Sequence, residues 1–257
     1  MLFICEKPSQ AKQISLALSK KCIHKNGYYL GEDNKIYTYT FGHLTEFKKP
    51  SEIDKNIKWN ESSIPFFFKE IPIKLIDKNN IKNQFNIIKN LFENENEEIY
   101  VATDSGREGE YIFRTVYELI DIKKKFKRLW LKDMTKDGII ESFKNAKEGS
   151  HYDSLALSAK MRAYADYLIG MNATMLATSI FKNNNYKNNI LSLGRVQTPT
   201  LCMIVERDLT IDNFKENKYY TLYYKLENNI NFEINLNEDI KYKKEKIQKF
   251  FKREDVF

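Results

Sequence analysis

The chain has 257 residues, of which 42% are hydrophobic and 30% are charged, a composition that supports a folded core and excludes a disordered protein. Its formal net charge of +7 is consistent with an anionic partner, although a lysine-rich solvated surface gives the same value. The three cysteines, Cys5, Cys22 and Cys202, form no CxxC pair, which argues against a zinc site or a disulfide framework. No segment has the character of a signal peptide or a membrane-spanning helix, so we expect a soluble cytoplasmic protein without membrane contact.

The first half of the chain alternates between strand and helix patterns. The apolar run at residues 2–5 predicts a buried strand, and Pro8 with Ser9 as a capping residue predicts the start of a helix. Further elements are expected as strands within 28–47 around a turn near Gly31 to Asn34, a helix at 78–93, a strand at 99–103, a helix from about Arg107, a strand at 128–131 and a helix near 135–146. This alternation predicts an α/β fold with a mainly parallel sheet that is covered on its faces.

The pattern changes after about residue 148. Two helices are predicted, at 151–182 and 198–210, with a low-complexity loop at 181–189 between them. Strands are expected from residue 215, and the lysine-rich stretch 241–255 is interpreted as an amphipathic helix. The predicted domains are an α/β domain at 1–148, a helical segment at 149–214 and the start of a β-rich region at 215–257.

Acidic residues follow two of the predicted strands. Glu6 comes after the first strand, Asp104 comes after the strand at 99–103, and Glu108 begins the next helix. Ligands of open α/β sheets bind outside the carboxyl ends of the strands, so these carboxylates converge if the two strands are neighbours. Carboxylate oxygens are the ligands that Mg²⁺ prefers, and Lys7 and Arg107 beside them could hold a phosphodiester.

An ordinary explanation stays open for each motif taken alone. Acids in the first turn of a helix stabilise it by ~0.3–1 kcal/mol, and a charged residue after a strand is usually part of a loop. The occurrence of both motifs at predicted strand ends favours the metal site. Gly106 and Gly109 would permit a tight turn and a close approach of the backbone.

Two of these segments, CEKPSQAK (5–12) and ATDSGREGEYI (102–112), resemble the Toprim domain of type IA DNA topoisomerases, in particular the bacterial topoisomerase III branch. Further segments agree in the same order, namely FGHLTEF (41–47), RLWLKDMT (128–135), and YADYLIGMNAT (164–174) followed by LSLGRVQTPTL (191–201). The resemblance covers residues 1 to about 225. It implies a Rossmann-like Toprim domain, followed by a helical segment and the start of a β-rich region.

The resemblance assigns catalytic and metal-binding roles by position. It implies that Glu6 supports the metal and proton transfer at the scissile phosphate, and that Lys7 contacts that phosphate. Asp104 and Glu108 match the family's acidic cluster, so the implied Mg²⁺ ligands are Glu6, Asp104 and Glu108. Arg107 matches the neighbouring catalytic arginine.

A second set of residues matches the family's groove for single-stranded DNA. Ser192, Arg195, Gln197 and Thr198 fall in a segment that lies along the DNA backbone in that family. Arg162 and Asp166, in the preceding helix, fall where the family lines the same groove. Thr198 followed by Pro199 also predicts a capped helix start that can meet a phosphate.

Two features depart from the family pattern. Many relatives have a second aspartate at the position of Gly106, so this chain offers one metal carboxylate fewer and a two-metal site is disfavoured. The family cuts DNA with a tyrosine in a Tyr-x-Arg-Thr or Tyr-x-Arg-Ser motif, and none of the sixteen tyrosines fits it. Tyr111, in YIFRT, has two residues before the arginine and is expected to be a half-buried aromatic. A fragment of a longer enzyme is the favoured explanation, and a natural truncated relic or a short protein with another task stay open.

The expected function is therefore that of the N-terminal part of a type IA topoisomerase. The resemblance implies an enzyme that breaks, passes and rejoins single DNA strands with Mg²⁺ and without ATP. The implied partners are single-stranded or negatively supercoiled DNA, with a helicase as a further partner, in the bacterial cytoplasm at the nucleoid or a plasmid. One alternative is a non-catalytic or relic single-strand DNA-binding Toprim protein. Another is a Toprim nuclease or primase, which the Glu-Lys-Pro-Ser and Asp-Ser-Gly runs disfavour.

Overall fold

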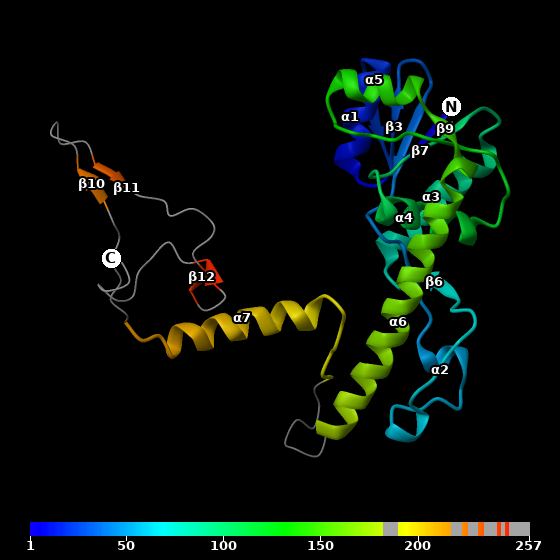
Figure 1. Cartoon of the computed structure of the whole chain (residues 1–257). Helices are drawn as coiled ribbons and strands as arrows, with labels where there is room; N and C mark the ends of the chain where they lie inside the picture. The colour runs from blue at the N-terminus through cyan, green and yellow to red at the C-terminus, as the bar shows by residue number, and fades with distance from the viewer. Residues whose placement is uncertain (182–189, 217–222, 226–230, 234–240, 243–244, 247–257) are drawn as a thin grey trace. The chain divides into compact units, whose positions relative to one another are not determined.

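The computed structural model describes residues 1–181, 190–216, 223–225, 231–233, 241–242 and 245–246 (Figure 1). The chain forms two compact units, Met1–Thr198 and Pro199–Phe257. This division differs from the predicted boundaries after residues 148 and 214, which stay predictions about domains.

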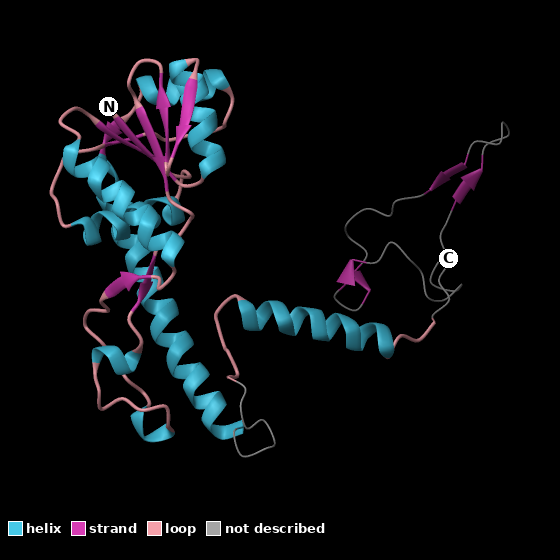
Figure 2. Ribbon diagram, turned by 180° about the vertical axis from the view of Figure 1, so that it is seen from behind, coloured by secondary structure: helices cyan, strands magenta, loops and turns pink. Residues whose placement is uncertain are grey.

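The first unit is built on a twisted β-sheet with helices on its faces (Figure 2). In the described residues the sheet has seven strands in the order β2-β3-β4-β1-β7-β8-β9, and its central strands β4, β1, β7 and β8 run parallel. The strands are β1 (Leu2–Cys5), β2 (Cys22–Lys25), β3 (Tyr28–Gly31), β4 (Ile36–Tyr39), β7 (Ile99–Ala102), β8 (Lys127–Arg128) and β9 (Lys147–Glu148). The helices of this region are α1 (Pro8–Ser19), α3 (Asn79–Asn94), α4 (Arg107–Ile120) and α5 (Lys136–Lys144). The predicted α/β class with a mainly parallel sheet is confirmed.

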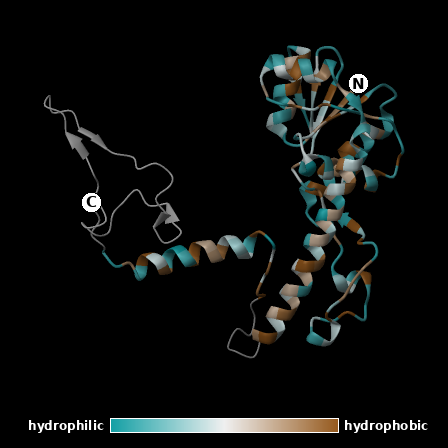
Figure 3. Cartoon of the chain, in the orientation of Figure 1, coloured by the Kyte–Doolittle hydropathy of each residue, from teal (hydrophilic) through white to brown (hydrophobic). Residues whose placement is uncertain are grey.

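Alternate residues of the central strands feed two separate hydrophobic cores. Leu2 and Ile4 of β1 pack with the helices α3 and α4, whereas Phe3 and Cys5 pack with α1 and α5. All four residues of β1 are fully buried, because a strand in the middle of a parallel sheet has a helical layer on both faces. Figure 3 shows the resulting concentration of hydrophobic residues in the sheet, and hydrophobic residues recur along α6.

A buried ion pair joins the sheet to α4. Arg128 and Glu110 are both fully buried, and Arg128 Nε donates to Glu110 Oε2 at 2.9 Å. The other guanidinium nitrogens of Arg128 donate to the carbonyl oxygens of Val101, Thr103, Asp104 and Leu129. Burial lowers the pKa of Arg128 and Glu110 opposes that change, but a guanidinium stays protonated in proteins. The side chain thus satisfies the carbonyl groups where β7 leaves the sheet.

A long helix and a strand pair extend from the sheet. The helix α6 (Asp153–Phe181) packs on α4 and continues beside β6 and α2 (Figure 1). The other elements here are β5 (Thr45–Phe47), α2 (Pro50–Ile53) and β6 (Ile73–Leu75), with 3-10 turns at Glu61–Ser63 and Gly149–Tyr152. Asn172 of α6 accepts a hydrogen bond from Phe66 N and donates one to Phe66 O, so its amide fixes the 60–70 segment on the helix.

The remaining elements are α7 (Gln197–Asp212), β10 (Tyr223–Lys225), β11 (Asn231–Glu233), β12 (Lys241–Tyr242) and β13 (Glu245–Lys246). β10 pairs with β11 and β12 pairs with β13, both antiparallel. The predicted strands after residue 215 are thus present at these positions. The helix predicted at 241–255 is wrong for residues 241–242 and 245–246, which pair as strands, and its remainder lies outside the described residues.

Most predicted elements are confirmed, with corrections at their ends. The N-cap of α1 is Lys7 and Pro8 is the first helical residue, so Ser9 does not cap the helix. The strand predicted at 128–131 ends at Arg128, because β7 ends at Ala102 and leaves Trp130 and Leu131 without a partner strand. The helix α7 begins at Gln197, which places Thr198 in its first turn rather than at its cap. Most of the low-complexity loop, residues 182–189, lies outside the described residues.

Replacing Glu110 with alanine is expected to lower the free energy of unfolding by about 3–5 kcal/mol, because Arg128 would stay buried without its partner. Urea unfolding followed by circular dichroism measures this loss. Glu108→Ala, at an exposed position in the same helical turn, is the matched control and should cost less than about 1 kcal/mol. Equal losses in the two variants would contradict a structural role for the buried pair.

Candidate functional site

The carboxyl ends of β1 and β7 bring Glu6 and Asp104 together. The two strands are parallel neighbours with Cys5 opposite Ala102, so the residues that follow them leave the sheet at the same edge. The Asp104 amide donates to Glu6 Oε2 at 3.1 Å. Glu6 is buried and Asp104 is exposed, which gives one carboxylate a fixed position and the other access to solvent.

Lys7 and Gln10 connect these two acids. Lys7 Nζ lies 3.2 Å from Asp104 Oδ2 and 3.4 Å from Glu6 Oε1, and the hydrogen bond to Asp104 raises the pKa of Lys7. Gln10 Nε2 donates to Asp104 Oδ1 at 2.9 Å, while Gln10 Oε1 accepts from the Glu6 amide at 2.8 Å. The amide of Gln10 therefore ties the end of one strand to the side chain that follows the other.

Glu108 and Arg107 lie in the first turn of α4, and both are exposed. Glu108 Oε2 is 3.7 Å from His43 Nε2, and His43 follows β4 on the other side of β1. Within the described residues, no three histidine, cysteine or acidic side chains lie close enough together to hold a metal ion. The structure thus brings two of the three predicted metal ligands together, and the full set stays a prediction.

Two glycines shape the loop between β7 and α4. Gly106 has φ 138° and ψ −176°, a conformation that is essentially restricted to glycine. A Cβ on Gly109 would lie 2.0 Å from the Asp104 carbonyl oxygen, so only glycine lets α4 begin this close to the loop. A side chain at position 106, aspartate included, would be strained in this backbone conformation.

The site is compatible with a divalent cation in its chemistry. Mg²⁺ commonly takes one or two protein carboxylates and completes its shell with water and phosphate oxygens. Glu6 and Asp104 supply two such carboxylates, and both already direct an oxygen at one cation, the ammonium of Lys7. The residues therefore fit a magnesium ion, and the ammonium of Lys7 lies where the two carboxylates would receive it.

A second cluster of predicted residues gathers around Asp166 of α6. Arg195 Nε donates to Asp166 Oδ1 at 2.6 Å, and Arg162 Nε lies 4.0 Å from Asp166 Oδ2. The hydrogen bond from Arg195 lowers the pKa of Asp166, so the pair is intact at neutral pH. Its contribution to stability is lost only as the pH falls below the ordinary aspartate range, about 3.9.

The segment 190–195 runs along α6 and continues into α7. Thr178 Oγ1 accepts a hydrogen bond from Leu191 N, and Thr174 Oγ1 accepts one from Leu193 N. Thr198 Oγ1 accepts from Gly194 N at 3.1 Å, and Ser192 Oγ lies 3.5 Å from Gln197 Oε1. These contacts hold Ser192, Gln197 and Thr198 in the segment that also carries Arg195, the partner of Asp166.

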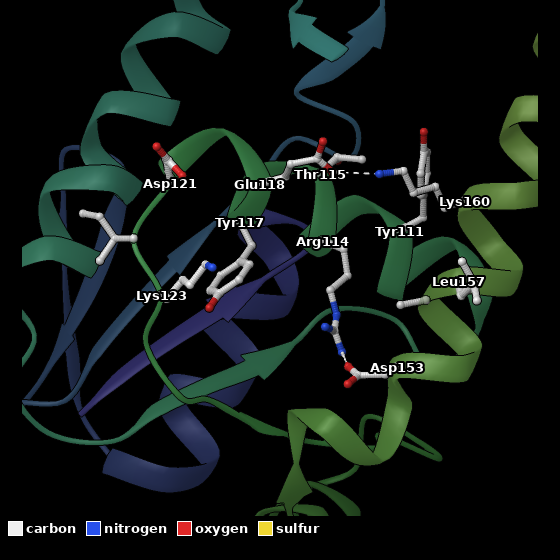
Figure 4. A pocket seen from close by; sticks show the side chains of 12 residues that line it. Tyr111, Arg114, Thr115, Tyr117, Glu118, Asp121, Lys123, Asp153, Leu157 and Lys160 are labelled. Carbon is white, nitrogen blue, oxygen red and sulfur yellow. Dashed lines mark hydrogen bonds and ion pairs between the residues drawn. The ribbon is translucent and has the colours of Figure 1, made fainter. Parts of the chain in front are cut away.

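A pocket of about 490 Å³ lies between α4 and α6 but holds none of the predicted site residues (Figure 4). Four of its charged side chains form ion pairs, Lys160 with Glu118 and Arg114 with Asp153. Tyr111 lines this pocket and is half-buried, as expected. Burial raises the pKa of Tyr111, which makes its phenol a poor source of a nucleophilic oxygen.

Sequence reasoning missed three residues of the site. Gln10 and His43 lie inside segments that carry the family resemblance, Gln10 at the start of the first helix and His43 after a strand, and nothing else in the sequence indicates either residue. Arg128 lies in a predicted strand, and its role is not evident from the sequence because an arginine in a buried strand needs partners that only the fold provides. Nothing in the periodicity of the chain indicated that Glu110, rather than Glu108, would be the partner.

The sequence matches two protein-family models. The Toprim domain model matches residues 1–134, and the DNA topoisomerase model matches residues 150–256. The chain is 37% identical over 247 residues to DNA topoisomerase 3 of Staphylococcus epidermidis, covering 95% of this chain and 33% of that protein. It is 40% identical over 219 residues to DNA topoisomerase 3 of Bacillus anthracis, covering 84% of this chain and 29% of that protein. The chain thus spans about a third of the length of these curated relatives.

Among solved structures, full-length topoisomerase I from Thermotoga maritima is similar in fold. The TM-score is 0.57 with 21% sequence identity, and the match covers 100% of this chain and 36% of that one. No helix in the described part of the chain is long and apolar enough to cross a bilayer.

Gly106→Asp is expected to lower the free energy of unfolding by about 1–3 kcal/mol, because aspartate disfavours the backbone conformation of this loop. Gly106→Ala should lose a similar amount, which separates strain from added charge. Urea unfolding of both variants measures the effect. Wild-type stability in Gly106→Asp would contradict the glycine requirement.

Proposed function

Because the chain belongs to the Toprim family and continues into the DNA topoisomerase family, we propose that it forms the N-terminal, metal-binding part of a type IA DNA topoisomerase. The observation that carries this proposal is the convergence of Glu6 and Asp104 at the ends of β1 and β7, with Lys7 between them. The similarity to the two DNA topoisomerase 3 proteins supports the topoisomerase III subtype.

The residues around the ends of β1 and β7 each have a role in this proposal. Glu6 and Asp104 hold Mg²⁺, which, when bound, offsets negative charge on a phosphodiester oxygen. Glu6 is fixed by its hydrogen bond from Asp104 N, and in this proposal it exchanges a proton with a sugar oxygen at the scissile bond. Lys7 and Arg107 are both exposed and are proposed to bind phosphate oxygens.

The second cluster is proposed to bind single-stranded DNA. Arg162 and Arg195 share the carboxylate of Asp166, which holds both guanidinium groups on one side of α6. Ser192, Gln197 and Thr198 add polar groups to the same stretch. Phosphate contacts of this type fix the path of a strand without reading its sequence.

Strand cleavage needs a nucleophile that we assign to sequence outside these residues. No tyrosine of the chain lies in a Tyr-x-Arg-Thr or Tyr-x-Arg-Ser motif. The curated relatives are about three times as long as the chain, which leaves room for the nucleophile and for further domains. In this proposal the chain supplies the metal-binding site, the phosphate contacts and part of the DNA path.

A chimera tests this function directly. The aligned third of the Staphylococcus epidermidis DNA topoisomerase 3 is replaced by this chain, and relaxation of negatively supercoiled DNA is followed on gels with Mg²⁺ and without ATP. The chimera is expected to relax DNA, and Glu6→Gln or Asp104→Asn should each lower the rate about 10²-fold or more. Glu32→Gln, an exposed acid at the opposite edge of the sheet, is the control and should keep full activity.

The isolated chain separates the competing functions. Incubated with labelled single-stranded DNA and Mg²⁺, it is expected to bind without producing either a covalent adduct or hydrolysed ends. Hydrolysed ends that disappear in Asp104→Asn would replace the proposal with a Toprim nuclease. A chimera that is folded but fails to relax DNA, beside a chain that binds DNA, would favour a single-strand binding protein.

Arg195→Ala is expected to weaken the binding of single-stranded DNA, because one phosphate contact is lost. The slope of log K against the logarithm of the salt concentration should become shallower by about 0.7–1. Asp166→Asn should have the opposite effect on affinity, since it removes a negative charge beside two arginines. Fluorescence anisotropy over a range of salt concentrations measures both. Unchanged affinity and slope in both variants would place the DNA path elsewhere.

A further inference from the structure

Lys7 lies where the two carboxylates of the site would receive a metal ion. Its ammonium is 3.4 Å from Glu6 Oε1 and 3.2 Å from Asp104 Oδ2. We infer that Lys7 is an internal counter-cation that holds the metal position in the metal-free protein, and that Mg²⁺ displaces it into solvent to bind phosphate. This inference rests on the proposed metal site and adds its regulation.

The hydrogen bonds of the two carboxylates support an exchange of cations. Glu6 Oε2 accepts from the Asp104 amide and Asp104 Oδ1 accepts from Gln10, so one oxygen of each carboxylate is held by a neutral donor. The other oxygen of each is directed at Lys7. Loss of Lys7 would therefore leave both carboxylates aimed at one point. Two cations at that point would repel each other, which makes occupancy by Lys7 and by Mg²⁺ mutually exclusive.

Movement of Lys7 requires only its side chain. The backbone of Lys7 is the N-cap of α1, and its carbonyl accepts the first hydrogen bond of that helix, from Ala11. The side chain is 55% exposed, and ion pairs between exposed groups are weak. A divalent ion can compete with such a pair, and the long flexible stem of a lysine lets the ammonium swing away while the helix stays in place.

Metal binding and phosphate binding should therefore be coupled. The ion frees the ammonium, and a phosphate that attracts the ammonium empties the metal position in return. Linkage requires that each ligand strengthens the binding of the other by the same factor. Before DNA arrives, the exchange would keep the two carboxylates neutralised by Lys7. It would free the Lys7 ammonium to bind phosphate only when the metal is present.

Titration of the 257-residue chain with Mg²⁺ by calorimetry tests the exchange, with Mn²⁺ and electron paramagnetic resonance as a second readout. Lys7→Met is expected to bind the ion about three- to tenfold more tightly than the wild type, because no internal cation competes. Lys7→Arg keeps the charge and should bind it no more tightly than the wild type. Lys12→Met, at an exposed position on α1, removes the same charge and should change the affinity by less than about twofold.

Thermal unfolding gives a test that does not depend on activity. Without Mg²⁺, Lys7→Met should melt below the wild type, since two carboxylates face each other unpaired. Saturating Mg²⁺ should raise its melting temperature by more than that of the wild type. Equal or weaker Mg²⁺ binding by Lys7→Met would overturn the exchange and leave the metal site standing. No Mg²⁺ binding by either protein would overturn the exchange together with the metal assignment in the proposed function.

Single-stranded DNA completes the test of coupling. With Mg²⁺ present, Lys7→Met should bind the DNA more weakly than the wild type, whereas without Mg²⁺ the two should differ little. A loss of DNA affinity that is independent of Mg²⁺ would contradict release of Lys7 by the metal. Ionic strength must be matched between the two conditions, because salt alone weakens phosphate contacts.

Discussion

The buried guanidinium of Arg128 holds together the loop from which the candidate site is built. It donates to the carbonyl oxygens of Thr103 and Asp104 and pairs with Glu110 in the first turns of α4. These carbonyl groups belong to a chain that has just left the sheet and has no strand partner for them. A buried carbonyl without a donor is costly, so a charged donor with several N–H groups is well suited to this position. The position of Asp104 and the start of α4 both depend on that one side chain.

The chemistry of the site follows from where the parallel strands end. β1 and β7 are neighbours, and the polar residues after them meet at one edge without any need for proximity in sequence. Gln10 and the Asp104 amide then fix the two carboxylates relative to each other. Lys7 keeps the pair compatible with folding, because two carboxylates this close repel when no cation is present. A site that binds a metal and a phosphate is in this way folded and electrically balanced before either arrives.

Local patterns were sufficient for most of the α/β region. The apolar runs at β1 and β7 and the helical spacing of Ile81, Phe85 and Ile88 depend on neighbours in sequence, and the structure agrees with them. Errors occur where the partner is distant. The strand at 128–131 was predicted too long because nothing local shows that β7 ends at Ala102. Residue type predicts Ser9 and Thr198 as helix caps, although in each case the helix begins before that residue.

The run of three acids after β7 shows where sequence stops and tertiary structure begins. Sequence alone, through strand periodicity and motif order, was enough to predict the fold class, the acids at two strand ends and the family. It could not assign separate tasks to Asp104, Glu108 and Glu110, since all three are carboxylates within seven residues. Tertiary structure separates them: Asp104 faces Lys7, Glu108 faces His43 and solvent, and Glu110 is buried against Arg128. The physical reason is that the role of a carboxylate depends on its burial and on which cation reaches it, and both are set by residues far away in the chain.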